Sequence, residues 1–428
     1  MDREATHRRP GTLALLMVSE WLLLSLIALL PLMKPAVRYP MIAADLLFPL
    51  LVAALTVEIA SGRRQLCWQP LFAVLIVYVL SLAPSLLATT DIAQSAFKLS
   101  TEVYLVGLAA ATVVVIRSEE ALRRATLVWL AVSAVIAALA IASLAVFVID
   151  PAGPLYRYSQ FGFGTLPPGH YPRLALTFFN ANMACNYLTV STGLVFLARD
   201  KQWLPKRWAW LLLAGIVVAA LSTISPGLGG IALALGIGFW MTRRSRTALI
   251  GAIAVAIAAT VALAITPIVH PTAPFVIHVP GTQWVLAPSG RFLVWSAALK
   301  EFLVHPLLGH GIGIEPVDVR YMDPSGNLQE LTDAHNVILS IAAQAGLIGL
   351  AGLTILMTYA CRLVVAGTTA TRILGFTFLN ALVYQGLSGS FEDARHLWVL
   401  LGLLAAAASL EITPADESNR TAAAPSPG

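Results

Sequence analysis

The sequence predicts an all-α protein, a polytopic transmembrane helix bundle of about 12 spans with one large periplasmic loop that carries an interfacial helix. Of its 428 residues, 58% are hydrophobic and 11% are charged, whereas an average soluble domain is about 25% charged. Apolar runs of about 20 residues, the length needed to cross a bilayer, recur along the chain. This composition excludes a soluble enzyme, a disordered protein and a disulfide-stabilised secreted scaffold.

Twelve apolar runs are predicted as spans. They lie near residues 12–33, 41–59, 71–88, 97–116, 125–149, 174–198, 208–224, 227–242, 248–269, 337–360, 370–387 and 396–411. The first follows Arg3, Arg8 and Arg9 and has no cleavage site, so we interpret it as a retained span rather than a signal peptide. Only Ser225 and Pro226 separate the seventh and eighth runs, which could instead form one broken hairpin.

The basic residues predict the orientation of these spans. Most of the 27 Lys and Arg residues fall in the two tails and in the even-numbered connections. Cytoplasmic loops carry such an excess, so both termini are expected in the cytoplasm. The same bias explains the net charge of +5 without any nucleic-acid partner. Cys67, Cys185 and Cys361 lack metal-like spacing, so neither zinc nor a disulfide is expected.

Four segments follow from this map: spans one to nine in 1–269, a large periplasmic loop in 270–336, spans ten to twelve in 337–411, and a disordered cytoplasmic tail in 412–428. The large loop opens with a Pro-rich extended stretch. A helical run then begins after Ser289, a good N-cap, and ends at Pro306. Its Trp and Phe content is typical of a helix that lies against the bilayer surface.

Polar residues on this helix are candidates for function. Arg291, Glu301 and His305 fall within one sector of a helical wheel. Lys300 and Glu301 fit an ordinary solvated face, whereas Arg291 runs against the topological charge bias and is therefore a candidate for a functional residue.

A second group of candidates follows the helix. His335 lies where the large loop enters the tenth span, and its titration range suits a general base. Asp333 or Asn336 could orient its ring; an interfacial polar role is the alternative. His310 could simply line a Gly-rich turn.

Outer polar residues near other spans are further candidates. Arg173 precedes the sixth span and could bind a phosphate bidentately. Asn180 and Asn182 lie deeper, where they could join helices or line a ligand cavity. Arg395 is another outer cation, which Glu392 and Asp393 could neutralise.

Ionisable residues inside the spans are expected to be paired, because an isolated charge in lipid is costly. Asp45, Lys98 and Glu102 are the examples, and Lys98 and Glu102 are i,i+4 neighbours. The sequence has no P-loop, HExxH, G-x-S-x-G or acidic pair for a metal-bound nucleotide sugar. We therefore expect no cofactor and no catalytic metal.

One ordered set of motifs resembles a known family. Arg291 and Trp295 precede HPLLGHGIG (305–313), and AHN (334–336) precedes AAQAGLIGL (342–350). This order is similar to that of the O-antigen ligase and polymerase superfamily of glycosyltransferases. Members share the span number and the late periplasmic loop, which implies a GT-C-like fold.

The resemblance implies metal-independent transfer of a glycan from an undecaprenyl-pyrophosphate lipid in the bacterial inner membrane, with the active site on the periplasmic side. It implies that Arg291 contacts the donor pyrophosphate and that His335 activates the acceptor hydroxyl. The expected substrate-binding residues are Arg173, Asn180, Asn182, His305, His310, Asn336 and Arg395. One departure stands out: many members carry an Arg in a Ser-Arg-Gly-like turn, where this sequence has Ser225-Pro226-Gly227. If that Arg is needed, another outer cation such as Arg173 must replace it.

Several functions fit these motifs. We favour an O-antigen ligase acting on lipid A–core in lipopolysaccharide biosynthesis, because AHN stands at a span entrance and the outer loop is modest. A polymerase that extends lipid-linked repeats uses the same donor. A protein O-oligosaccharyltransferase is a further alternative. A transporter would predict repeated halves and charges at the membrane centre. The sequence shows no internal repeat and has its large loop late in the chain, and both features argue against a transporter.

Overall fold

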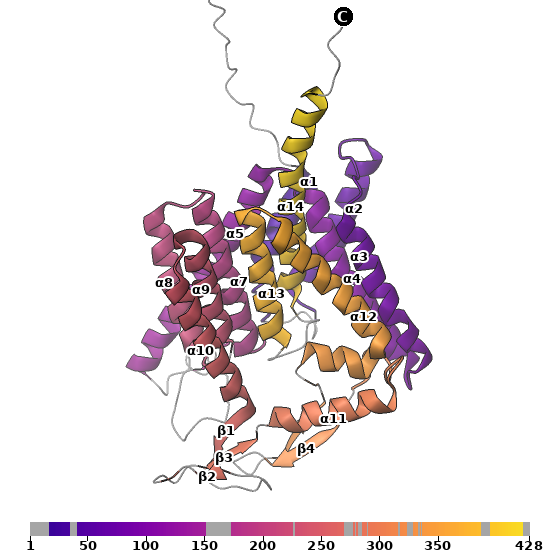
Figure 1. Cartoon of the computed structure of the whole chain (residues 1–428), viewed down its shortest axis with the longest axis vertical. Coiled ribbons are helices and arrows are strands. Elements are labelled where there is room, and N and C mark those ends of the chain that lie inside the picture. Colours follow the sequence, from indigo (N-terminus) through magenta and orange to yellow (C-terminus); the bar gives the residue numbers. More distant parts are fainter. Residues whose placement is uncertain are drawn as a thin grey trace, which may run out of the picture.

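The computed structural model describes residues 17–34, 41–150, 173–225, 227–268, 277–278, 280, 285–288, 290–315, 317–322, 328–332, 334, 336–386 and 394–422. As predicted, the described chain is a helix bundle. Figure 1 shows helix α11 and short strands at one end of the bundle, and the last helix leaving the opposite end.

A helix occupies each of the twelve predicted ranges. These helices are α1 (Val18–Leu29), α2 (Leu47–Ala60), α3 (Pro70–Leu82), α4 (Ile92–Val115), α5 (Glu119–Ile149), α7 (Ala181–Asp200), α8 (Lys206–Ser222), α9 (Leu228–Arg243), α10 (Arg246–Ala264), α12 (Val337–Ala366), α13 (Thr369–Gly386) and α14 (Arg395–Ala422). The seventh and eighth runs are two separate helices, α8 and α9, joined at residues 223–227.

By length and composition, five helices of the described chain could cross a membrane: Ala43–Ala60, Pro70–Leu87, Ile92–Val115, Glu119–Ile149 and Val337–Ala366. Three shorter helices, α1, α9 and the first part of α10, are also apolar. The protein is therefore a membrane protein, while the number of twelve spans stays a prediction.

The central helices are the less apolar ones because protein, not lipid, surrounds them. In α7, nearly every residue from Ala181 to Ala198 is buried, including Asn186 and Thr192. By contrast, only 22% of the apolar window in α5 is buried. Polar side chains inside a membrane are tolerated where they face the bundle interior, so α7 can be polar and still lie within it.

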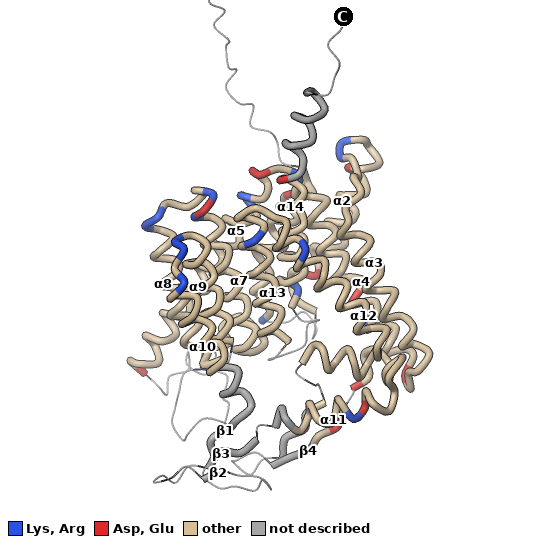
Figure 2. The backbone as a smooth tube through the Cα atoms, in the orientation of Figure 1, with Lys and Arg blue, Asp and Glu red and all other residues tan. Residues whose placement is uncertain are grey.

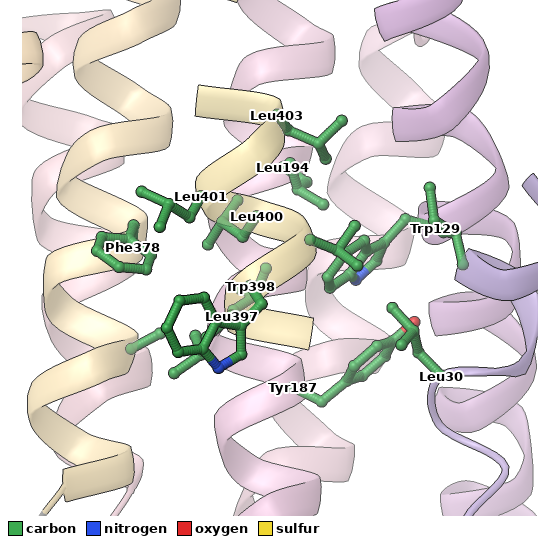
Figure 3. Packing of buried hydrophobic residues seen from close by; sticks show 14 of the residues in the cluster. Leu30, Trp129, Tyr187, Leu194, Phe378, Leu397, Trp398, Leu400, Leu401 and Leu403 are labelled. Carbon is green, nitrogen blue, oxygen red and sulfur yellow. The ribbon is translucent and has the colours of Figure 1, made fainter. Parts of the chain in front are cut away.

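Large side chains fill the centre of the bundle. Figure 3 shows Leu397, Trp398 and Leu401 of α14 among residues from neighbouring helices, including Trp129 of α5 and Tyr187 of α7. The indole of Trp129 stacks on the Tyr187 ring, with centroids 5.3 Å apart. The first turns of α14 therefore lie in the core of the bundle.

The end of the bundle opposite α14's exit contains short strands that sequence analysis did not predict. β1 (Ile265–Ile268), β3 (Val285–Pro288) and β2 (Ile277–His278) form an antiparallel sheet in the order β1-β3-β2. The predicted ninth span, 248–269, is therefore wrong at its end: α10 stops at Ala264. β-branched residues and Pro267 favour an extended chain there.

A second antiparallel pair lies in the same loop. β4 (Val319–Met322) pairs with β5 (Leu328–Leu331), with Val319 opposite Leu331. At the other end of the chain, α14 continues to Ala422, into the segment predicted as a disordered tail. Extending an existing helix is easier than nucleating one, which accounts for the difference.

Candidate active site

Helix α11 (Gly290–Val304) forms where the sequence predicts it and ends before Pro306. One side of the helix packs against the loop and the start of α12. Val294 and Ala298 lie in a buried cluster with Val317, Ala334 and Ala343. This cluster fixes α11 across the end of the bundle (Figure 1).

Helix α12 is broken at Gly346, whose backbone is not helical (φ 63°, ψ −158°). The segment that follows α11 supplies the hydrogen bonds that the break removes. The N–H of Leu347 donates to the Pro306 carbonyl (2.8 Å), and the N–H of His310 donates to the Ala343 carbonyl (2.8 Å). The N–H of Gly311 donates to the Gln344 carbonyl (3.1 Å). The HPLLGHGIG segment is thus a backbone partner of the break in AAQAGLIGL.

The glycines of these two segments allow that close approach. A Cβ on Gly309 would lie 2.3 Å from the carbonyl carbon of Gln344, and one on Gly346 would lie 2.3 Å from the Leu307 oxygen. Both glycines have positive φ, which other residues adopt only with strain. The motif spacing is therefore explained by contact between two backbones.

The two predicted catalytic residues are described only in part. Arg291 is in the first turn of α11, with its side chain outside the described part, and His335 lies outside the described residues. Their neighbours are informative: Val294, one helical turn after Arg291, and Ala334, adjacent to His335, belong to the same buried cluster. The fold therefore brings the two chain segments together.

Asn336 has a structural task of its own. It caps α12, and its side-chain oxygen accepts hydrogen bonds from the N–H groups of Ile338 (3.1 Å) and Leu339 (3.2 Å). Asp333, the other predicted partner of His335, lies outside the described residues.

Arg173 precedes α7 in the sequence, and its side chain lies beside the turn between α8 and α9. Its Nε donates to the Thr223 carbonyl (3.2 Å), and its Nη2 donates to Asn182 Oδ1 (3.1 Å). Asn182 Oδ1 also accepts from the Ser225 hydroxyl (2.8 Å), whose oxygen accepts from the Gly227 N–H (3.1 Å). The half-buried guanidinium is thus held beside the Ser225-Pro226-Gly227 turn, in which only Pro226 lies outside the described residues.

Other groups surround this arginine. Asn180 caps α7 through the N–H of Met183 (2.9 Å). The backbone N–H of Lys34 donates to the Thr177 carbonyl (2.9 Å). The backbone of Lys34 therefore lies against the segment that precedes α7. Partial burial lowers the pKa of the Lys34 amine. A cation and several amide groups therefore gather at the end of α7, an arrangement that can receive an anion.

Comparison with known proteins agrees with this geometry. Residues 208–354 match a family model described as O-antigen ligase. This match supports the resemblance of the chain to the O-antigen ligase and polymerase superfamily. The matched segment runs from α8 through the break in α12, so it includes the turn beside Arg173 and both contacting motifs. No curated protein matches the chain.

One predicted site residue, Arg395, is bound to other protein groups. Arg395, 5% exposed, makes a bidentate ion pair with Asp45 through Nε (2.6 Å) and Nη2 (2.8 Å). Asp45 also accepts from the Tyr104 hydroxyl (2.5 Å). Asp45 is thus paired, as predicted. The other partners suggested for Arg395, Glu392 and Asp393, lie outside the described residues.

The predicted pair inside α4 is present as well. Lys98 Nζ lies 3.8 Å from Glu102 Oε1, and the Tyr78 hydroxyl donates to the same carboxylate (3.3 Å). The internal salt bridge expected from the i,i+4 spacing is confirmed.

Glu301, His305 and His310 form a cluster at the end of α11. Glu301 Oε1 lies 3.6 Å from His305 Nε2 and 3.0 Å from His310 Nδ1. Helical spacing predicted the closeness of Glu301 and His305, but not that of His310. His310 joins them because the chain turns back at the Gly-rich segment. Carboxylate and imidazole are also the side-chain groups that bind transition metals.

Sequence analysis missed His396. Its Nε2 lies 2.7 Å from Asn186 Oδ1 of α7, and its ring packs edge-on against Tyr187. The histidine is 1% exposed, and these contacts are typical of a residue that joins two helices. The sequence does offer a signal for this contact: His396 follows Arg395 at the entrance to a predicted span. Two adjacent polar side chains there need polar partners on other helices.

Proposed function

We propose that the protein is an O-antigen ligase, which transfers a glycan from an undecaprenyl-pyrophosphate lipid to a hydroxyl of lipid A–core. The observation that carries the proposal is the contact between the 305–313 segment and the break in α12, within the matched family segment. This contact joins the segment that bears Arg291 to the one that bears His335. The proposed site is at the periplasmic face of the inner membrane, with both termini in the cytoplasm.

The proposed reaction is an inverting displacement at C1 of the donor sugar. His335 accepts the proton of the acceptor hydroxyl as its oxygen forms a bond to C1. The bond from C1 to the pyrophosphate breaks on the opposite face, and the leaving group keeps the electron pair. Arg291 stabilises the negative charge that develops there. The arginine and the histidine carry these steps, and no metal takes part in them.

Arg173 is proposed as the second cation for the pyrophosphate. The side chain lies beside the turn in which many members of the superfamily carry an arginine, held by Thr223 and Asn182. A guanidinium suits a phosphate because its N–H groups match two oxygens at once. Direct substrate contacts of Asn180, Asn182, His305, His310, Asn336 and Arg395 stay predictions.

A polymerase is the second candidate, because it would use the same donor and the same arginines. The ligase is favoured by the position of AHN at the entrance to α12 and by the modest length of the outer loop. A protein acceptor and a transport function remain alternatives, and no feature of the described residues favours either.

The lipopolysaccharide of a deletion strain separates ligase from polymerase. Loss of the whole O-antigen ladder, with lipid-linked polymer accumulating, supports the ligase. A band with a single repeat would instead indicate a polymerase, and an unchanged ladder would contradict both. Complementation with the unaltered gene is the control.

The same strain tests Arg291. We expect Arg291→Ala to abolish the ladder at unchanged membrane abundance, because the pyrophosphate loses its cation. Arg291→Lys should restore it only partly, since the bidentate fork is lost. A normal ladder in the Ala strain would remove Arg291 from the mechanism.

A further inference from the structure

The Glu301, His305 and His310 cluster is the one group in the described residues where three potential metal-ligand side chains converge, with all three ligand atoms within 4.8 Å of one another. Glu301 lies in the last turn of α11, His305 directly follows that helix, and His310 lies in the turn beyond Pro306. The three side chains thus belong to two different local structures, which a bound ion would join.

We propose that this cluster binds a divalent transition metal of the zinc class. With zinc–nitrogen and zinc–oxygen bonds of about 2.0–2.2 Å in a tetrahedral site, ligand atoms lie about 3.4 Å apart. The carboxylate oxygen lies 3.0 Å from one imidazole nitrogen and 3.6 Å from the other. These two separations lie on either side of the tetrahedral value, and the ligand nitrogens of the two imidazoles lie within 4.8 Å of each other. Side-chain rotations would bring all three atoms to tetrahedral spacing.

The ligand chemistry selects this class of ion. Two imidazoles and one carboxylate suit zinc and its neighbours, whereas magnesium and calcium prefer sites made of oxygen atoms alone. The side chains of His305, His310 and Glu301 are 46%, 32% and 29% exposed. An ion can therefore enter from solvent, and a water molecule can take the fourth position.

A bound metal ion would stabilise the fold of the loop. The backbone N–H of His310 is bound to the Ala343 carbonyl beside the break in α12, while its ring faces Glu301 of α11. Metal binding would therefore tie the end of α11 to the break in α12. The inference does not depend on the proposed function, because no step of transfer passes through the metal.

Zinc binding by the purified full-length protein in detergent tests the proposal. The protein is first stripped with EDTA and dialysed, and Zn²⁺ is then added in competition with a chromophoric chelator. We expect a single ion per chain at micromolar zinc and a higher midpoint of thermal unfolding, since a ligand that binds only the folded state stabilises it.

Two variants and a control locate the site. His310→Ala and Glu301→Gln should each weaken zinc binding by at least about a hundredfold, the upper range for changes even to residues that only support a ligand. Both should lose the zinc-dependent rise in the unfolding midpoint. Glu315→Gln, which alters an exposed acid in the same loop, should behave like the unaltered chain.

Three results would overturn the proposal: no zinc bound at micromolar concentration, equal zinc affinity in His310→Ala, or the same loss in the Glu315→Gln control. If His310→Ala does not fold, His305→Ala tests zinc binding in its place. The His305 side chain is the most exposed of the three proposed ligands, so its loss disturbs the fold least.

Discussion

At the scale of the residue, Arg173 is the cation that we propose in place of the arginine absent from the Ser225-Pro226-Gly227 turn. It precedes α7 in sequence, yet its guanidinium binds the end of α8 at Thr223. The intervening Asn182 links it to Ser225, within the turn. A side chain held by groups from two elements is pre-organised, so it loses little conformational entropy when it binds a phosphate.

Replacement of Arg173 should therefore impair transfer. We expect Arg173→Ala to lower the transfer rate by about 10²–10³-fold, the usual cost of losing one donor to a developing negative charge. Arg173→Lys should recover part of that loss. The measurement is transfer by purified protein from a lipid-linked donor to lipid A–core.

Arg207 offers the matched control for this change. It is an exposed arginine at the opposite end of α8, beside the Trp208 ring. Arg207→Ala should keep the normal rate. Equal activity in the Arg173 and Arg207 variants would show that Arg173 only joins helices.

His335 is the other residue-scale test. His335→Ala should lose about two to four orders of magnitude in transfer rate, the usual share of a general base, while still binding the lipid-linked donor. His335→Gln should do no better, because an amide cannot accept the proton. The unaltered enzyme should also slow as the medium becomes acidic, since a protonated imidazole is no longer a base.

A normal rate in the Gln variant would make His335 a positioning residue. For an inactive variant, donor binding is measured separately, and retained binding shows that the protein has folded and has lost only the transfer step. A variant that loses both binding and transfer would contradict the assigned role as a base.

At the scale of the element, the break in α12 depends on the Gly-rich segment that follows α11. Four backbone groups of the broken helix find partners in residues 306–311, so the break leaves those polar groups satisfied. Unsatisfied backbone groups at membrane depth are costly, which explains why the break and the Gly-rich segment occur together.

A side chain at Gly346 should disrupt this arrangement. Gly346→Ala places a Cβ 2.3 Å from the Leu307 oxygen at a φ of +63°. We expect a loss of at least about 1–3 kcal/mol in stability, the range for a strained backbone conformation. The measurement is the midpoint of thermal unfolding in detergent.

Gly251→Ala is the control, because nothing lies within 4 Å of the added Cβ in α10. That change should leave the midpoint unchanged or slightly higher. If Gly346→Ala unfolds at the same temperature as Gly251→Ala, the tight contact with Leu307 does not hold the break.

At the scale of the molecule, charge separates the two ends of the bundle. Figure 2 shows many of the described Lys and Arg residues near the end from which α14 leaves. Such a bias is typical of the cytoplasmic side. Helix α11 lies at the opposite end, where the orientation proposed above places the periplasm.

Cysteine labelling tests this orientation. Cys67 is exposed between α2 and α3, whereas Cys185 is buried. In a protein that lacks Cys361, a membrane-impermeant thiol reagent should leave Cys67 unlabelled in spheroplasts until they are permeabilised. Lys300→Cys in the same background, on exposed α11, should be labelled in intact spheroplasts. The reverse pattern would invert the topology.

The sequence by itself determined where the helices lie and which superfamily the chain resembles. Long apolar runs predict helices because a chain in lipid must satisfy its backbone hydrogen bonds internally. The end of α11 at Pro306 was predictable for a similarly local reason, since proline cannot continue a helix. The order of motifs from Arg291 to AAQAGLIGL was enough to indicate the superfamily.

Only the tertiary structure decided which residues meet. Asp45 and Arg395 pair across 350 positions, and no local pattern encodes that choice. Arg173 reaches the turn after α8, and His310 reaches Glu301, because the packing of the elements brings them there. Periodicity and spacing report forces between near neighbours along the chain, whereas the partners of a buried charge depend on how all the helices pack together.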